Sequence, residues 1–102
     1  MDHVSVDGYV IDSLMPDLVG HDRIPSAFLV YLYLWRRTRG GARAAVASYA
    51  MMTDGTGLSQ RSVQTAVRAL ERRGLVEARR ASVTSPPSFT LVCHWRDRKK
   101  TS

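Results

Sequence analysis

The sequence predicts one small α+β domain that is mainly helical and carries a β-hairpin near its C-terminal end. Three observations lead to this prediction. The length of 102 residues suits a single hydrophobic core. Glycine and proline residues divide the chain into short elements. A strongly amphipathic stretch at residues 59–73 is followed directly by two short strand-like runs.

The N-terminal third is expected to contain an acidic arm followed by a first helix. The arm spans residues 1–24. Within it, residues 8–11 are expected to form a short strand or an extended stretch, and residues 13–20 are expected to form a helical turn. The first helix is predicted over residues 26–37, because Pro25-Ser26 is a start signal and Gly40-Gly41 a stop signal. Its apolar run AFLVYLYLW has no clear periodicity, so the pattern alone does not distinguish a helix from a buried strand. Its length and the stop signal favour a helix.

Two capped helices are predicted in the middle of the chain, after a short strand at residues 43–47. Ser48 caps a second helix that runs to about residue 55, because a serine oxygen accepts one of the free N–H groups of the first turn. Ser59 caps a third helix, which runs to Arg73 and ends at Gly74, a residue suited to the left-handed conformation that closes a helix.

The C-terminal part is predicted to be a hairpin of two strands at residues 75–80 and 88–95, joined by the loop ASVTSPP. Period-two alternation places four side chains of the second strand on one face: Phe89, Leu91, Cys93 and Trp95. Residues 96–102 form a basic tail. Helix, short strand, two helices and a hairpin follow one another in the order of a winged helix-turn-helix, expected here as a domain over residues 25–95.

The net charge of +6 hides an uneven distribution along the chain. Residues 1–22 contain five aspartates and no Lys or Arg, whereas the other 80 residues contain all 15 basic side chains and only four acidic ones. A body this basic favours a polyanionic partner, with nucleic acid as the first candidate and an anionic membrane surface as the second. Solubility alone is a further explanation of the charge.

The third helix has two chemically different faces. Val63, Val67 and Leu70 recur at helical spacing and must face a core. The opposite face carries Arg, Gln and Thr side chains. Arg pairs with guanine and Gln with adenine through two hydrogen bonds, and Ser or Thr binds phosphate or a base edge. The residues expected to read bases are Arg61, Gln64, Thr65 and Arg68.

Residues 48–76, SYAMMTDGTGLSQRSVQTAVRALERRGLV, resemble the helix-turn-helix of winged-helix DNA-binding proteins. In those proteins a pattern of the type SY-x-x-L-A-x-x-TGLS-x-R-T-V-x-x-A-L recurs, followed by L-x-x-x-GL-I. The matching positions are Ser48-Tyr49, Thr56-Gly57-Leu58-Ser59, Arg61-Ser62-Val63, Leu70 and Gly74-Leu75-Val76. The stretch PSAFLVYLYLWRRT more loosely resembles the first helix of small bacterial and phage regulators of the GntR-like, MarR-like or replication-initiator-like type.

The sequence departs from that pattern at two places. Met52-Thr53 replaces the usual Leu-Ala, and Met substitutes well for Leu in a core. Asp54-Gly55 is a poor helix-forming pair, expected to loosen the end of the second helix.

The resemblance implies that the hairpin is a wing whose loop touches phosphate or the minor groove, although a plain surface hairpin is the alternative. The residues expected to contact the DNA backbone lie on this hairpin and on the second and third helices with their caps: Ser48, Ser59, Gln60, Ser62, Arg72, Arg79, Arg80, Ser82 and Thr84. Such contacts position a protein on DNA without specifying sequence.

The first helix is apolar nearly all round and must be covered on more than one side. Small winged-helix regulators commonly dimerise, so the resemblance implies a homodimer. The interface is expected at Tyr31, Tyr33, Leu34 and Trp35. The alternative is that the N-terminal segment folds back over this face.

Several classes of protein are disfavoured. The longest apolar run has nine residues, too few to span a membrane, and the acidic N-terminus is unlike a secretory signal, so a cytoplasmic protein is expected. No nucleophile motif or phosphate-binding loop is present, and no enzyme activity or cofactor is expected. Cys93 and His94 point to opposite faces of a strand, so no metal site is expected.

These observations predict a sequence-specific protein for double-stranded DNA, most simply a transcription regulator, with the helix at residues 59–73 in the major groove and the hairpin at 75–95 as the wing. A replication initiator or another DNA-processing accessory is an alternative that the same residues would serve. A winged-helix module for protein interaction, without DNA binding, is the alternative from another class.

Overall fold

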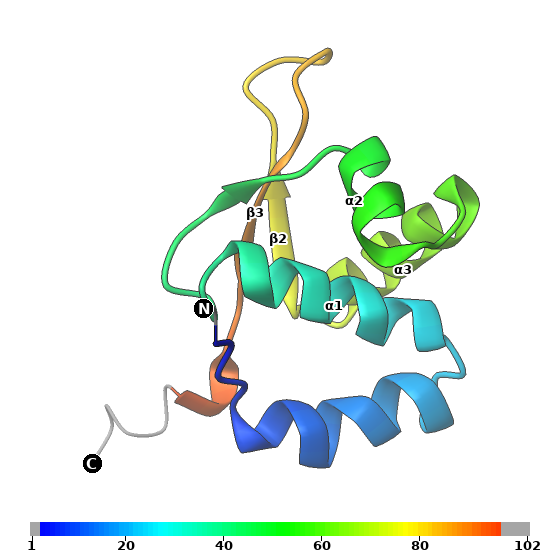
Figure 1. The fold of residues 1–102 in the computed structure, drawn as a ribbon, viewed down its shortest axis with the longest axis vertical. Helices are drawn as coiled ribbons and strands as arrows, with labels where there is room; N and C mark the ends of the chain where they lie inside the picture. The colour runs from blue at the N-terminus through cyan, green and yellow to red at the C-terminus, as the bar shows by residue number, and fades with distance from the viewer. Residues whose placement is uncertain (1–2, 97–102) are drawn as a thin grey trace.

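The computed structural model describes residues 3–96 and has the α+β winged helix-turn-helix fold that the sequence predicts (Figure 1). Three α-helices form the body, and a small antiparallel sheet lies beside them. The elements are α1 (Pro25–Arg37), β1 (Ala45–Val46), α2 (Tyr49–Thr56), α3 (Gln60–Arg72), β2 (Val76–Arg79) and β3 (Ser88–Leu91).

Both predicted serine caps are present. The Ser48 hydroxyl accepts a hydrogen bond from the Met51 N–H at 3.1 Å, and the Ser59 hydroxyl accepts one from the Ser62 N–H at 3.1 Å. Each bond satisfies a first-turn donor that would otherwise have no partner in the helix. The caps fix where α2 and α3 begin, and so they set the turn between them.

The turn between α2 and α3 depends on Gly57, whose φ of 81° lies in the left-handed region that glycine tolerates best. Asp54-Gly55 does not loosen the preceding helix, because α2 continues through Gly55 to Thr56. A Cβ on Gly55 would collide with the ring of Tyr33. Gly55 therefore lets α2 pack closely against α1, which explains a helix-breaking residue inside the helix.

The sheet has the strand order β1-β3-β2, and all its pairs are antiparallel. Phe89 at the centre of β3 pairs with Ala45 on one side and Ala78 on the other. Its side chain is fully buried in the same core as Val63 and Leu70 of α3. The short predicted strand at residues 43–47 is thereby confirmed as the third strand of the sheet.

The second hairpin strand is shorter than predicted. β3 ends at Leu91, and residues 94–96 form a turn of 3₁₀ helix. Phe89 is buried, but the expected alternation does not extend to Cys93 and Trp95. Trp95 instead stacks on Tyr9 with ring centroids 4.5 Å apart, and its indole N–H donates to the Asp7 carboxylate at 2.8 Å. Contact with the N-terminal segment thus replaces strand pairing.

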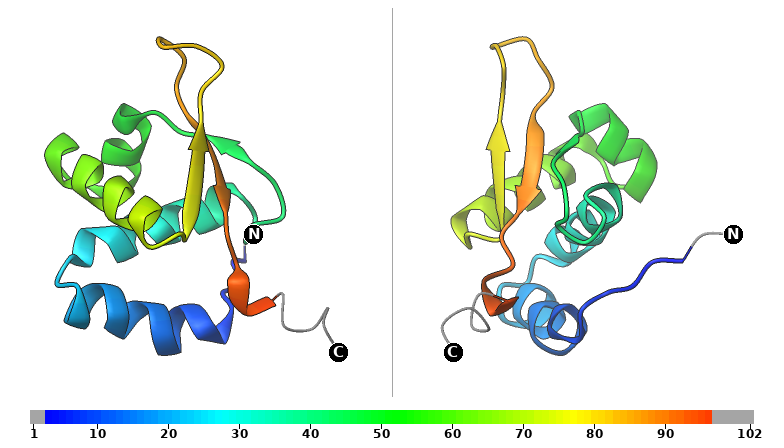
Figure 2. Two further views of the ribbon diagram at one scale, coloured as in Figure 1. Left: turned by 180° about the vertical axis from the view of Figure 1, so that it is seen from behind. Right: turned by 90° about the vertical axis from the view of Figure 1, so that its left-hand side faces the viewer.

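The expected strand at residues 8–11 is wrong, because the N-terminal segment is helical. It contains two wide-turned π-helices, η1 (Val10–Leu14) and η2 (Pro16–His21), with i to i+5 hydrogen bonds such as Asp22 N–H to Asp17 C=O at 2.8 Å. The two views of Figure 2 show this segment lying along α1. Val10, Leu14 and Leu18 are buried in the main core, so a segment expected as an arm forms part of the body.

This packing also buries most of the residues that were expected at a dimer interface. Tyr31 and Leu34 are fully buried and Trp35 is 2% exposed within a single chain, which corrects the expectation that they offer a surface to a second protomer. The Trp35 indole N–H donates to the Ser5 carbonyl at 2.8 Å, so the N-terminal segment covers this face. Tyr33 is half-buried, with the Arg37 guanidinium 5.5 Å from its ring centroid.

An ion pair ties the N-terminal segment to α3. Arg73, which caps the C-terminal end of α3, donates two hydrogen bonds to the Asp22 carboxylate at 2.8 and 2.9 Å. Hydrogen bonds from Arg73 and then from His21 hold the pKa of Asp22 well below its usual range. Arg73 also lies 3.7 Å from Asp17.

Candidate nucleic-acid interface

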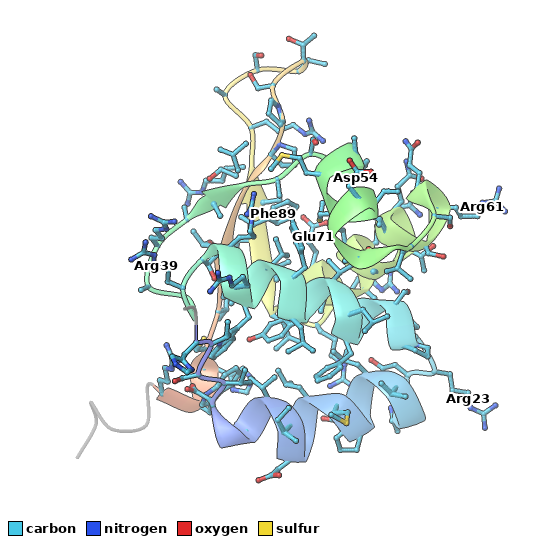
Figure 3. All side chains as sticks on the ribbon, viewed as in Figure 1. Arg23, Arg39, Asp54, Arg61, Glu71 and Phe89 are labelled. Carbon is cyan, nitrogen blue, oxygen red and sulfur yellow. The ribbon has the colours of Figure 1, made fainter. Side chains whose placement is uncertain are left out.

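Helix α3 divides into a buried face and an open face, as its sequence predicts. Val63 and Leu70 are fully buried and Val67 is 3% exposed, and all three lie in the main core. Residues spaced three or four apart lie on one side of a helix, so this apolar stripe fixes which side faces away from the core. Arg61 projects from the body at the α3 end of the molecule (Figure 3).

The residues expected to read bases lie together on the open face of α3. Arg61, Thr65 and Arg68 are exposed, and Gln64 is half-buried. Within residues 3–96, neither Arg61 nor Arg68 has a side-chain hydrogen bond or an ion pair. Both guanidinium groups can therefore bind an external partner without breaking a contact inside the chain.

The residues expected to contact the DNA backbone fall into two groups, and the first lies at the starts of the helices. Gln60 and Ser62 are in the first turn of α3, where free N–H groups favour an anion. The Ser59 hydroxyl is 3.1 Å from the Ser62 hydroxyl as well as capping the helix. Ser48 has the same capping role in α2. Arg72 is exposed at the opposite end of α3.

The second group lies on the hairpin that corresponds to the wing. Arg79 ends β2 and is exposed, and the loop that follows projects away from the helices (Figure 1). The Arg80 guanidinium donates to the Ser85 carbonyl at 2.6 Å, while the Ser82 hydroxyl lies 2.8 Å from that of Ser85 and 3.4 Å from that of Thr84. These bonds within the loop give it a defined shape while all four of the expected residues, Arg79, Arg80, Ser82 and Thr84, stay exposed.

Sequence reasoning did not identify two surface features. Val83, between Ser82 and Thr84, is 93% exposed, which is unusual for an apolar side chain and places it at the outside of the wing loop. The second feature is a group of arginines at the C-terminal end of α1 and in the loop that follows it, in the stretch RRTRGGAR at residues 36–43. Four arginines within eight residues are the signal that the sequence offers, but the sequence alone does not show that they line one hollow.

The described residues offer little to other classes of function. Residues 3–96 contain no group of three or more His, Cys, Asp or Glu side chains that could hold a metal ion. None of the helices within that range has the length and apolar character needed to cross a membrane.

The chain matches the model of a known family, and the match coincides with the body of the fold. The model of a helix-turn-helix domain family matches residues 25–76, from the start of α1 to the first residue of β2. Comparisons with curated proteins and with solved structures gave no significant match. The matched stretch covers just over half of the chain and includes all of α3, and this family is of a DNA-binding, non-enzymatic kind. The chain belongs to the helix-turn-helix domain family.

Proposed function

We propose that the protein binds double-stranded DNA in a sequence-specific manner and acts as a transcription regulator. The observation that carries the proposal is the open face of α3, where exposed Arg61 and Arg68 have no partner among the described residues. Unpaired guanidinium groups on the side of the helix that faces away from the core can bind base edges or phosphate. DNA binding in general is supported by the helix-turn-helix family match.

In the proposed complex α3 lies in the major groove, which is wide enough to admit an α-helix. Arg61, Gln64, Thr65 and Arg68 contact base edges, since Arg and Gln can each form two hydrogen bonds with a purine. Gln60, Ser62 and Arg72 contact phosphates on either side. The wing loop, with Arg79, Ser82 and Thr84, contacts the adjacent backbone and fixes the orientation of α3 in the groove.

The test begins with selection of bound sequences from random duplexes, which supplies the cognate site. Arg61→Ala and Arg68→Ala are then expected to weaken binding to that site by about 1–3 kcal/mol each and to relax specificity at one position, because each removes a base contact. Arg23→Ala is the control, since Arg23 is exposed but lies away from Arg61 in Figure 3. Unchanged affinity in both α3 variants would disprove the assignment of α3 to the groove.

The selected sequence also reports the number of copies bound. A two-fold symmetric dimer binds two half-sites, so a palindromic selected site would indicate a dimer on DNA. Since Tyr31, Leu34 and Trp35 are buried, such a dimer would have to form through other residues.

A further inference from the structure

A basic hollow lies at the C-terminal end of α1. It has a volume of about 960 Å³ and is lined by five arginines, Arg36, Arg37, Arg39, Arg43 and Arg96. Asp7 is the only carboxylate among the described residues that line it. We call Arg37, Arg39 and Arg43 the loop surface.

The charge of the loop surface is not neutralised from within the hollow. Asp7 accepts a hydrogen bond from the Arg96 guanidinium at 2.8 Å, so the one carboxylate is already paired with the fifth arginine. Arg37, Arg39 and Arg43 are exposed and share the hollow with no further described carboxylate. Cations held this close together repel one another and gain from an anion that lies between them.

The backbone beneath the loop surface is held in an unusual conformation. Arg39, Gly40 and Gly41 have φ values of 53°, 67° and 87°, and a positive φ is uncommon for a residue such as Arg39. The buried Thr38 hydroxyl donates to the Leu34 carbonyl at 2.7 Å and accepts from the Gly41 N–H at 3.1 Å. Arg96 also donates to the Gly40 carbonyl at 2.9 Å.

These contacts make a rigid base for the arginines. Local strain of this kind persists when the surrounding structure fixes it, and it is concentrated at functional sites. A fixed backbone also reduces the conformational entropy that would be lost on binding. The loop surface is therefore organised for a ligand before the ligand arrives.

The loop surface is well separated from α3. Figure 3 shows Arg39 and Arg61 on opposite sides of the molecule. We propose that the loop surface binds the phosphate backbone of a second segment of duplex DNA while α3 holds the first, so that one molecule bridges two segments. The proposal rests on the proposed function for the first segment, and contacts with phosphate do not require a particular sequence in the second.

An acidic segment of a second copy of the chain is the competing occupant, because the N-terminal helices are acidic. The structure argues against it. Asp7 pairs with Arg96, and Asp17 and Asp22 pair with Arg73, so three of the aspartates between residues 3 and 22 are already used inside the chain. Asp12 alone is left for three arginines, whereas duplex DNA offers one negative charge for about every 1.7 Å of its axis.

The experiment follows the backbone amides of the full chain by NMR as duplex DNA is added beyond one equivalent. Once the first equivalent has occupied α3, the second is expected to shift the Gly40 and Gly41 amides. In parallel, immobilised cognate duplex saturated with protein is expected to capture a labelled duplex of unrelated sequence. In Arg39→Gln/Arg43→Gln the slope of log capture against log salt should become shallower by about 1.8, at about 0.9 for each lost phosphate contact.

Arg23→Gln is a matched control for Arg39→Gln. Both residues are exposed arginines with positive φ, at 59° and 53°, and neither side chain has a partner among the described residues. Arg23→Gln should capture the second duplex as the wild type does. Equal capture by the Arg39→Gln/Arg43→Gln and Arg23→Gln proteins would overturn the proposal, as would static Gly40 and Gly41 amides. A larger shift of those amides with polyglutamate of matched charge would assign the surface to acidic protein instead.

Failure of the proposed function gives a different result. In that case the α3 amides would not respond to the first equivalent, and Arg61→Ala with Arg68→Ala would leave retention on the immobilised duplex unchanged. The response of Gly40 and Gly41 would still decide whether the loop surface binds duplex DNA.

Discussion

Helix α3 and the N-terminal segment both pack against α1, and they use their charged side chains differently. On α3, Arg61 and Arg68 face outward with no partner among the described residues. On the N-terminal segment, Asp7 and Asp22 pair with arginines from the far end of the chain and from α3. Both regions bury an apolar stripe in the same core.

The difference separates side chains that hold the fold together from those left open to a partner. Ion pairs within the chain use up charges that could otherwise attract another molecule. Unpaired cations at a fixed spacing contribute little to folding, and they are ready to bind phosphate or a base edge. We thus assign the N-terminal segment to stability and propose that the open face of α3 binds DNA.

The largest expected effect comes from the buried stripe of the N-terminal segment. Leu18→Ala should lower the free energy of unfolding by about 2–5 kcal/mol, because it removes a fully buried side chain and leaves a cavity. Urea denaturation measures the loss, and DNA affinity should stay unchanged while the variant is folded. Val19→Ala is the control, since Val19 is the next residue and is 38% exposed. Equal stability of the two variants would mean that η2 does not dock on α1 in solution.

Neighbouring arginines at the end of α3 sharpen the comparison. Arg72 is exposed with no partner among the described residues, whereas Arg73 is paired with Asp22. Arg72→Ala should make the slope of log affinity against log salt shallower by about 0.9, because one phosphate contact is lost, without changing the melting temperature. Arg73→Ala should lower the melting temperature slightly and keep the slope. The reverse pattern would break the division between stability and binding.

The smallest effect concerns the pH dependence of stability. Arg73 and His21 lower the pKa of Asp22 in the folded state, so the pair stabilises the fold above the unfolded pKa of about 3.9 and the contribution is lost as pH falls through the lowered folded pKa. Asp22→Asn should therefore be less stable than the wild type at neutral pH, and the difference should shrink in acid. A difference independent of pH, followed by urea denaturation, would argue against the ion pair as its source.

The sequence predicted α3 well because several local signals agree there. Ser59 supplies the cap, Gly74 with φ of 70° supplies the stop, and Val63, Val67 and Leu70 mark the core face. Each signal acts over a few residues, and no distant contact opposes it. The position of the open face follows directly from the buried one.

The N-terminal segment was predicted only in part, because its signals disagree: residues 13–20 are helical as expected, but residues 8–11 are helical instead of extended. Val10, Leu14 and Leu18 recur every four residues and indicate a helix, but Pro16 and the glycines on either side suggest turns. The segment forms one π-helix before Pro16 and a second π-helix that begins at Pro16, so it is helical on both sides of the proline. Packing on α1 stabilises both π-helices. Such packing depends on the tertiary fold and cannot be read from local propensity.

The dimer surface and the strand through Trp95 failed for a related reason. The first prediction treated an apolar face as open to a second protomer, and the second treated one as paired within the hairpin. In both cases residues far away in sequence cover the face. Trp35 bonds to Ser5, and Trp95 bonds to Asp7, across separations of 30 and 88 residues. The loop surface was missed for the opposite reason, because its arginines come together only after the glycine pair turns the chain.

The carboxylate of Asp7 binds both the indole of Trp95 and the guanidinium of Arg96, so a single side chain fastens the two extremities of the described chain to each other. In engineering terms the ends are not independent. Removing residues 1–9 takes away Asp7 and Tyr9, the stacking partner of Trp95, and so frees both Trp95 and the Arg96 side chain that donates to the Gly40 carbonyl. Trimming the N-terminal end therefore loosens the loop beside α1, because the Arg96 side chain that binds Gly40 is itself held by Asp7.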